Sequence, residues 1–465
     1  MLYFSSSVRA GILLLATFLV TSIIPLTAQR TMGVTLSEKG QQDGYILFAP
    51  MVSKTTYLID KKGRMVNSWT SETLPGQSAY LLKDGSLLRA STDKKAVLKK
   101  SGNGGIIEKF NWEGKLTWSY KISDSLESQH HDIFPMPNGN ILAIVYSIKS
   151  YEQALVAGRN PNFAPSVVFS EKIVEIKPEG DTGRIVWEWN AWDHIVQDVD
   201  PSKANFGSLI DHPELINLNY QANKVEVAGD WIYLNSVYYN PDLDQIVVSS
   251  YDFDELWIID HSTTTAEAAS HSGGKSGKGG DLLYRWGNPY TYNAGTRDDQ
   301  YFFAQHAAHW IEKGRPDAGK IMIFNNGARG GGNNYSSVDI IAPPMDKQGR
   351  YVYEKGKPFP PKTPSWRYVD TTVGKFFTSH MSNAERLPNG NTLICNGLLG
   401  EFFEVTPKNK IVWKYKNPVF MNGPVAQGTV VNGGSFMFRC AFYPTTYPAF
   451  TSRKIKPGGT IELTP

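Results

Sequence analysis

Short runs of alternating apolar and polar residues, separated by tight-turn signals, recur along most of the chain. His380–Tyr415 shows the pattern best: HMSNAERLPNGNTLICNGLLGEFFEVTPKNKIVWKY. It contains a strand, an Asn-Gly turn, a buried strand, an insert, a third strand, a turn and a strand that closes near Trp413. A period of two bounded by Asn-Gly or Asp-Gly is typical of β-hairpins. The segment therefore predicts a unit of four antiparallel strands.

Degraded copies of this unit occur upstream. His131–Trp189 and Tyr80–Tyr120 follow the same order of strands and turns, and no long helical period appears. Six units are recognisable: Gly44–Trp69, Ala79–Lys121, His130–Asn190, Trp231–Trp286, His306–Tyr353 and His380–Pro418. Repetition of a supersecondary unit predicts an array of sheets. We expect an all-β fold, a six-bladed β-propeller with four antiparallel strands in each blade.

A single domain, residues 29–465, is expected to contain all the blades. Ser435–Leu463 holds two further short strands, which are expected to return to the first blade and close the ring. Two inserts interrupt the pattern: an irregular polar segment at 191–227, and a Ser/Gly-rich segment at 263–280 that predicts a flexible, solvated loop. Tryptophans recur near the blade ends and are interpreted as packing residues: Trp69, Trp118, Trp187, Trp286 and Trp413.

The composition suits a large globular domain and excludes one class of partner. The 465 residues are 41% hydrophobic and 12% aromatic, as expected for sheets packed against sheets. The formal net charge is only +3 and there is no long basic stripe, so no nucleic-acid partner is expected. Cys395 and Cys440 lie in strand-like runs and form either a disulfide or two buried thiols.

The N-terminus has the features of a signal peptide at residues 1–28. Arg9 supplies a positive charge, Ala10–Ile24 an apolar run, and Leu26–Ala28 a cleavage site. The apolar run is short for a membrane span, so no stable span is expected after cleavage; an uncleaved anchor is the alternative. The expected location is therefore periplasmic or secreted.

Histidines mark the beginnings of several units. His130, His306 and His380 each precede the first recognisable strand of a unit, and Tyr233 holds a comparable place in the fourth unit. Because the first strand of each propeller blade lines the channel, these side chains are expected to converge on one pocket. The alternative is that each histidine caps its strand with a hydrogen bond. The repetition of the position favours the pocket.

Three further residues are candidates for this pocket. His306 and His309 have i, i+3 spacing, which places them on opposite faces of a regular strand, so no metal site is predicted there. Arg329 follows a strand ending in FNNG, and its guanidinium would suit a tetrahedral oxyanion. Arg439, in the apolar run FMFRCAF, is either paired in the core or directed into the channel.

Several segments, taken in order, resemble the bacterial arylsulfate sulfotransferase family. They include HHDIFPMPNGNILAI, DWIYLNSVYYNPDLDQIVVSS, FFAQHAAHW, IMIFNNGARG and LPNGNTLICNG, and the resemblance covers nearly all of the chain after the signal peptide. It implies a six-bladed propeller that moves a sulfuryl group from an aryl sulfate donor to a phenolic acceptor without PAPS. The implied mechanism is ping-pong, through a sulfohistidine. No cofactor or metal is expected, and a homodimer is left open.

The resemblance also implies roles for particular residues. His380 matches the nucleophile, His306 a supporting histidine, and Arg329 the arginine that binds sulfate. Tyr233 stands where the family has a histidine and is expected to donate a proton to the leaving oxygen. Other residues are expected to bind substrate: His130, His131, Asn326, His309 and Arg439.

Three positions depart from the family's motifs. D-W-x-H-x-N-S reads DWIYLNS at Tyr233, QHDAHW reads QHAAHW at Ala307, and FDNG reads FNNG at Asn325. These departures leave two alternatives to the sulfotransferase. One is a non-catalytic exported propeller that binds a sulfated or aromatic ligand or a partner protein. The other is a His-dependent sulfate ester hydrolase; the formylglycine sulfatase pattern C-x-P-x-R is absent.

Overall fold

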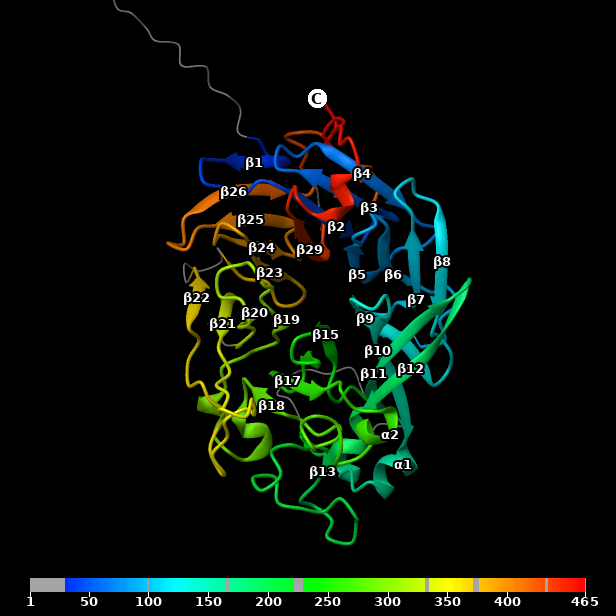
Figure 1. The fold of residues 1–465 in the computed structure, drawn as a ribbon, viewed down its shortest axis with the longest axis vertical. Coiled ribbons are helices and arrows are strands. Elements are labelled where there is room, and N and C mark those ends of the chain that lie inside the picture. The colour runs from blue at the N-terminus through cyan, green and yellow to red at the C-terminus, as the bar shows by residue number, and fades with distance from the viewer. Residues whose placement is uncertain are drawn as a thin grey trace, which may run out of the picture.

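Six antiparallel sheets form a ring, which confirms the predicted six-bladed β-propeller (Figure 1). The computed structural model describes residues 30–98, 100–163, 167–220, 229–330, 334–370, 376–430 and 434–464. The predicted signal peptide lies outside these residues. Within them, no helix is long and apolar enough to cross a membrane.

The strands of each blade follow one another outwards from the centre of the ring. Blade 1 contains β29 (Met437–Tyr443), β2 (Tyr45–Pro50), β3 (Thr55–Asp60) and β4 (Met65–Thr70). Blade 2 contains β5 (Pro75–Leu81), β6 (Leu87–Thr92), β7 (Gly105–Phe110) and β8 (Leu116–Lys121). Blade 3 contains β9 (Glu127–Pro135), β10 (Ile141–Ser150), β11 (Val167–Glu179) and β12 (Thr182–Asn190).

The other half of the ring is built in the same way. Blade 4 contains β15 (Leu234–Asn240), β16 (Gln245–Ser250), β17 (Glu255–Asp260) and β18 (Tyr284–Trp286). Blade 5 contains β19 (His306–Trp310), β20 (Ile321–Asn325), β21 (Ser337–Ile341) and β22 (Trp366–Val369). Blade 6 contains β23 (Asn383–Arg386), β24 (Thr392–Asn396), β25 (Glu401–Val405), β26 (Ile411–Lys416) and β1 (Gly33–Ser37).

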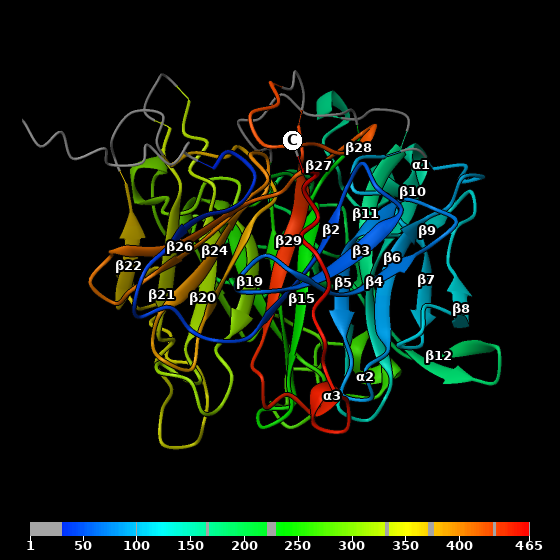
Figure 2. The same ribbon diagram turned by 90° about the horizontal axis from the view of Figure 1, so that it is seen from above.

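Short elements connect the blades. The two small sheets pair β13 (Ile195–Val196) with β14 (Ile216–Asn217), and β27 (Val419–Phe420) with β28 (Gly423–Pro424). The helices are α1 (Tyr151–Val156), α2 (Thr265–Ala268) and α3 (Pro448–Thr451), with 3-10 turns η1 (Pro161–Phe163), η2 (Ala191–His194), η3 (Pro289–Tyr292) and η4 (Arg297–Asp299). Figure 2 shows α2 and α3 at the opposite end of the ring from β27 and β28.

The two ends of the described chain close the ring twice. As expected, the C-terminal region returns to the first blade, but it supplies one strand and α3 instead of the two expected strands. β29 pairs antiparallel with β2 over Tyr45↔Tyr443 to Phe48↔Cys440. The sequence did not predict the second closure, in which β1 adds a fifth, outermost strand to blade 6 by pairing with β26. Both pairings cover strand edges that would otherwise be open to other chains. Cys395 and Cys440 are free, buried thiols.

The interpretation of the blade-end tryptophans as packing residues is confirmed. All five are buried. Each indole N–H also donates a hydrogen bond to the following blade: Trp69 to Asn111 O (2.9 Å), Trp118 to Thr182 O (2.6 Å), Trp187 to Thr263 Oγ1 (3.1 Å), Trp286 to Pro361 O (2.7 Å) and Trp413 to Lys61 O (2.9 Å). The hydrophobic core between the blades is therefore reinforced by one directional bond at each of these positions.

Five of the six innermost strands carry a β-bulge. The pairing register shifts in β5, β9, β15, β19 and β29. Residues with positive φ lie in or beside these shifts: Gln77 (95°), His131 (50°), Tyr233 (48°) and Ala307 (56°). Bulges twist a strand and change the direction of its side chains, and they are common beside functional sites. Here they surround the place where the predicted site residues meet.

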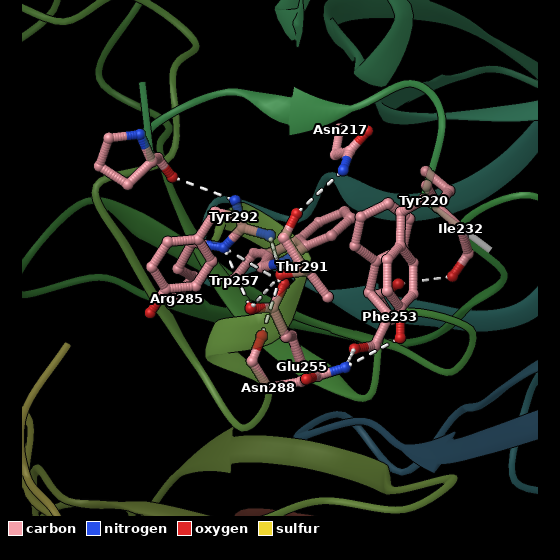
Figure 3. Close-up of polar contacts among 12 residues, drawn as sticks. Asn217, Tyr220, Ile232, Phe253, Glu255, Trp257, Arg285, Asn288, Thr291 and Tyr292 are labelled. Atoms are coloured by element: carbon pink, nitrogen blue, oxygen red, sulfur yellow. Dashed lines mark hydrogen bonds and ion pairs between the residues drawn. The ribbon is translucent and has the colours of Figure 1, made fainter. Parts of the chain in front are cut away.

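Both inserts are fixed to blade 4. A buried ion pair between Arg285 and Glu255 anchors the first insert, because Arg285 Nη1 also donates to the carbonyls of Pro213 (3.1 Å) and Leu215 (3.0 Å) (Figure 3). The second insert, 263–280, is the segment predicted to be a flexible, solvated loop. It contains α2, and a backbone hydrogen bond joins Gly280 N to Ser270 O (3.0 Å). Its glycines allow the tight positive-φ turns of this compact loop.

Candidate active site in the propeller channel

Aromatic and imidazole rings from four blades meet near the beginnings of the inner strands. The ring of His131 lies 4.9 Å from that of Tyr233 and 6.0 Å from that of Phe438. The ring of His306 lies 6.3 Å from Phe438 and 5.8 Å from Tyr251. Of the four residues expected to converge, Tyr233 and His306 belong to this group of rings, together with His131, the neighbour of His130.

His306 supports the segment that carries His380. Its Nδ1 lies 2.8 Å from Asn326 Oδ1, and its Nε2 accepts a hydrogen bond from the backbone N–H of Met381 (3.2 Å). Because Nε2 is an acceptor, the neutral tautomer with the proton on Nδ1 satisfies both contacts. Asn326 Nδ2 donates to the carbonyls of Thr378 and Met381, at 3.0 Å each. These contacts fix the backbone on both sides of His380.

His380 is exposed at the start of blade 6. Its Nδ1 lies 2.9 Å from Ser379 Oγ, and its carbonyl accepts a hydrogen bond from Thr378 Oγ1 (3.0 Å). Its Nε2 makes no hydrogen bond to any residue that the structure describes. Partial desolvation lowers the pKa of His380 below the ordinary value. The ring is therefore neutral near pH 7 and presents an accessible nitrogen lone pair.

His130 and His131 occupy the bulge of β9 and have different surroundings. Burial, with His306 and Arg439 nearby, lowers the pKa of His131 to about 3. His130 is fully buried: its Nδ1 lies 2.8 Å from His131 Nδ1, and its ring stacks on Tyr146. Burial also lowers the pKa of His130 well below the ordinary value. His130 is thus placed to orient His131.

Tyr233 lies directly before β15, with its ring against His131 and 5.5 Å from Tyr251. Burial raises the pKa of Tyr233 above the ordinary value for a phenol. The hydroxyl therefore stays protonated at neutral pH and can donate a hydrogen bond. It is a weaker acid than an exposed tyrosine, which reduces its capacity to transfer a proton fully.

The two candidate cations have different partners. Arg439, in the bulge of β29, forms an ion pair with the fully buried Asp132 and donates from Nη1 to Tyr80 OH (3.2 Å). Although burial opposes it, the Asp132 charge raises the pKa of Arg439 further. Of the two positions left open by the sequence, Arg439 is paired, at the centre of the ring. It nevertheless remains near enough to His131 to affect that pKa.

Arg329 is half-buried between the rings of Phe303 (4.8 Å) and Tyr335 (4.1 Å). Its Nη1 donates to the carbonyls of Gly327 (3.2 Å) and Tyr335 (2.9 Å). Nε and Nη2 make no hydrogen bond to the described residues, so two of its three nitrogens remain available for an anion. Among the described residues, no hydrogen bond or ion pair joins Arg329 to His380.

The expectation that His306 and His309 face opposite sides of their strand is wrong. His306 pairs with Phe324 and His309 with Met322, two residues apart on β20, so both histidines lie on one face of the sheet. The bulge at Ala307 causes the change. His309 lies near the C-terminal end of β19, and its imidazole ring is 5.7 Å from the ring of Tyr238. Burial lowers the pKa of His309 to about 4. Its Nδ1 contacts Ala307 O (2.9 Å).

Sequence reasoning missed Phe438 and Tyr251 as walls of the site and Asp132 as its buried anion. Asp132 connects three elements: it pairs with Arg439, accepts from Tyr80 OH (3.2 Å), and accepts from Val237 N (3.1 Å). The string His130-His131-Asp132 was the available signal, because a carboxylate beside two histidines at a strand start is unusual for a solvent-facing turn. No comparable signal distinguishes Phe438, because it lies in the apolar run FMFRCAF and looks like an ordinary core residue.

Comparison with known proteins gives one family match over most of the chain. A family model described as Arylsulfotransferase (ASST) matches residues 33–422. No curated protein matches. Among solved structures, a protein of unknown function from Bacteroides caccae is similar at 11% identity, with 86% of this chain and 98% of that chain covered and a TM-score of 0.44. Virginiamycin B lyase from Staphylococcus aureus follows at 11% identity, 83% and 88% coverage and a TM-score of 0.36.

Proposed function

The chain belongs to the arylsulfotransferase family, and from that premise we propose that it transfers a sulfuryl group from an aryl sulfate to a phenolic acceptor without PAPS. The family match spans residues 33–422, and membership supports aryl sulfotransferase activity in general. The proposal adds a ping-pong mechanism with His380 as nucleophile. One observation carries it: a neutral, exposed imidazole with a free Nε2 on a backbone segment fixed from both sides.

The proposed first step forms an N–S bond and breaks an S–O bond. The Nε2 lone pair of His380 attacks sulfur, and the electron pair of the broken bond leaves on the aryl oxygen. In the second step, an acceptor phenol that has lost its proton to solvent attacks the sulfohistidine as the phenolate, the N–S bond breaks, and the imidazole recovers its lone pair. A covalent intermediate divides one difficult transfer into two easier ones.

Neighbouring groups would hold the nucleophile and stabilise developing charge. His306 and Asn326 act through the backbone at Met381 and Thr378, so they are positioning residues for His380. Arg329 has two unengaged nitrogens and a planar fork suited to sulfuryl oxygens. Tyr233, protonated because its pKa is raised, would donate a hydrogen bond to the leaving or attacking phenol oxygen.

The test is phenolate release from 4-nitrophenyl sulfate by the purified chain, with and without added phenol. Release that depends on phenol and disappears in His380→Asn supports sulfuryl transfer through His380. His212→Asn is the matched control, because His212 is also exposed but lies in the insert at 191–227. Near-normal transfer by His380→Asn would defeat the assignment.

The two alternatives remain outcomes of the same experiment. Release without any acceptor would identify a sulfate ester hydrolase that uses the same histidines. A non-catalytic binding propeller is favoured by the replacement of a family histidine with Tyr233, whose raised pKa makes it a poor base. Saturable binding of aryl sulfates, without turnover of any donor in a broad panel, would support the non-catalytic binding propeller.

A further inference from the structure

Two histidines and an aspartate meet outside the channel, where the two inserts touch. His194 belongs to η2, His271 to the loop after α2, and Asp281 lies just before β18. Asp281 Oδ1 is 2.9 Å from His194 Nδ1 and 2.8 Å from His271 Nδ1. One ligand atom from each residue lies within 4.8 Å of the others. His194 is fully buried, whereas His271 is exposed.

In a neutral His194 ring, the hydrogen bonds place the proton on Nε2 and leave Nδ1 without one. His194 Nε2 lies 2.8 Å from Ala268 O, a carbonyl that only accepts, so Nε2 carries the proton. In the neutral ring Nδ1 is then a lone pair, and it faces a carboxylate oxygen of Asp281. Two lone pairs at this distance repel each other unless a proton or a metal cation lies between them.

We propose that His194, His271 and Asp281 bind a zinc ion. Two imidazole nitrogens and one carboxylate oxygen suit Zn²⁺, whereas Ca²⁺ and Mg²⁺ prefer oxygen ligands in larger number. In a tetrahedral site the ligand atoms lie about 3.4 Å apart, so the rings need to move outwards by about 0.5 Å to admit the ion. Such movement is available to His271, which is exposed.

The surroundings of His194 match those of a metal ligand. Metal-binding histidines usually donate their other N–H to a carbonyl or carboxylate, as His194 does to Ala268. The ring also stacks on Trp189, with an interplanar angle of 2°. Gly280 packs so closely that an added Cβ would lie 2.5 Å from His194 Nε2. These neighbours hold the ring of His194 in one orientation, with Nδ1 directed at Asp281.

A cavity of about 370 Å³ opens beside the cluster and is lined by His271, Asp193 and His212 among others. It offers a route for an ion to enter and space for water to complete the coordination, as a three-residue site requires. The contrast with His261 is informative. Carboxylates of Glu175 and Asp244 contact opposite nitrogens of that ring, so it needs two protons and no metal.

The expected role is structural. The ion would join η2 at the end of blade 3 to the loop and strand of blade 4, adding a third fastening to the inserts besides the Arg285–Glu255 pair and the Trp189 Nε1–Gly280 O bond (2.7 Å). The three ligands are brought together only in the folded chain, so zinc would bind the folded state and not the unfolded one. Zinc is therefore expected to raise the unfolding temperature. The inference is independent of the proposed transferase activity.

The test uses the purified chain after treatment with a chelator. Calorimetric titration with ZnCl₂ measures zinc binding, and thermal unfolding with and without ZnCl₂ measures the effect on stability. We expect one zinc ion per chain, a raised unfolding temperature, and no such rise with MgCl₂. His271→Ala removes an exposed ligand without opening the core, and we expect zinc affinity to fall at least about tenfold. Asp281→Asn should lower it as well.

The control is His212→Ala, which lines the same cavity but lies outside the cluster and should bind zinc like the wild-type chain. Equal zinc affinity in wild type and His271→Ala would overturn the proposal. Absence of zinc uptake by the wild-type chain would also overturn it.

Discussion

At the scale of single residues, the charge of each histidine depends on what its ring nitrogens contact. Among the described residues, His380 has one ring nitrogen without a hydrogen bond and no carboxylate partner, and desolvation lowers its pKa. His261 has a carboxylate on each nitrogen: Glu175 Oε2 at 2.8 Å and Asp244 Oδ1 at 3.0 Å. Burial alone would lower the pKa of His261, but these two partners outweigh it and raise the pKa. The first ring is neutral near pH 7 and has an accessible nitrogen, whereas the second forms an ion-paired link between blades.

The lowered pKa of His380 predicts the acid side of the rate profile. A histidine must be neutral to attack sulfur, and a lowered pKa keeps it neutral at more acidic pH. The acid limb of kcat/KM for 4-nitrophenyl sulfate should therefore have its midpoint below about 6.5, the ordinary histidine value. A midpoint above that value would contradict His380 as the nucleophile in this environment.

The raised pKa of His261 predicts a pH-dependent stabilisation. The contribution is fully present below the ordinary histidine pKa and is lost as pH rises through the raised value. His261→Gln should lower the free energy of unfolding by about 2 kcal/mol near pH 6. The difference from wild type should shrink at alkaline pH, as measured by denaturant unfolding. His212→Gln is the exposed control; a pH-independent deficit in His261→Gln would refute the imidazolium.

Sequence alone predicted which residue types gather in the channel, but not their detailed directions. His306 and Tyr233 were found because the beginnings of inner strands are repeated positions in a propeller. The relation of His306 to His309 was predicted wrongly, since a bulge at Ala307 changes which face a side chain occupies. The bulge depends on pairing with β20 and on neighbouring blades, which no local pattern encodes.

At the scale of elements, the blades are joined by hydrogen bonds from outer-strand tryptophans. Trp413 on β26 is fully buried, donates to Lys61 O (2.9 Å) and lies under Lys61 Nζ, 3.6 Å from the ring centroid. Trp366 on β22 holds a similar outer position but is half-buried, with the Arg386 guanidinium 4.4 Å from its ring. Its indole makes no hydrogen bond to the described residues.

These differences predict that replacing tryptophan with phenylalanine lowers the free energy of unfolding more at Trp413 than at Trp366. Trp413→Phe removes the interblade hydrogen bond, leaves Lys61 O unsatisfied and opens a small cavity, which should cost about 2–3 kcal/mol. Trp366→Phe removes less buried surface and no such bond, so about 1 kcal/mol is expected. Denaturant unfolding of both variants gives the comparison. Equal losses would show that the hydrogen bond contributes little beyond packing.

The strands and turns of the blades were largely predictable, because period-two alternation and Asn-Gly turns are local signals. The flexibility predicted for the segment at 263–280 stays a prediction, but its glycines gave no sign of the short helix α2 within it. In the folded protein they permit close contacts, such as Gly280 against Ala268 and His194, that larger residues would prevent. Composition does not distinguish these two uses of glycine.

At the scale of the whole molecule, ring closure and the channel site depend on each other. β29 comes last in the sequence but supplies the inner strand of blade 1, and with it Phe438 and Arg439. The closure by β29 was predicted from two unassigned strands near the C-terminus. The addition of β1 to blade 6 was not, because a short strand before the first blade carries no sign of its distant partner.

The two closures should differ in importance. A chain ending before Ser435 loses β29, leaving β2 with an open edge inside the ring, and should fail to fold into a soluble, cooperative unit. A chain lacking β1 loses only an outermost strand and should remain soluble with a lowered unfolding temperature. Soluble yield and scanning calorimetry test both. Wild-type cooperativity without β29 would contradict its role in closing the propeller.

The central claim is that His380 carries the sulfuryl group between two substrates. The most direct measurement is peptide mapping by mass spectrometry after the purified chain is mixed with 4-nitrophenyl sulfate and quenched in base. We expect one added SO₃ group on the peptide containing His380, which disappears when phenol is added before the quench and never forms in His380→Asn. Phenol-dependent transfer with no adduct on this peptide, or an adduct on another histidine, would contradict it.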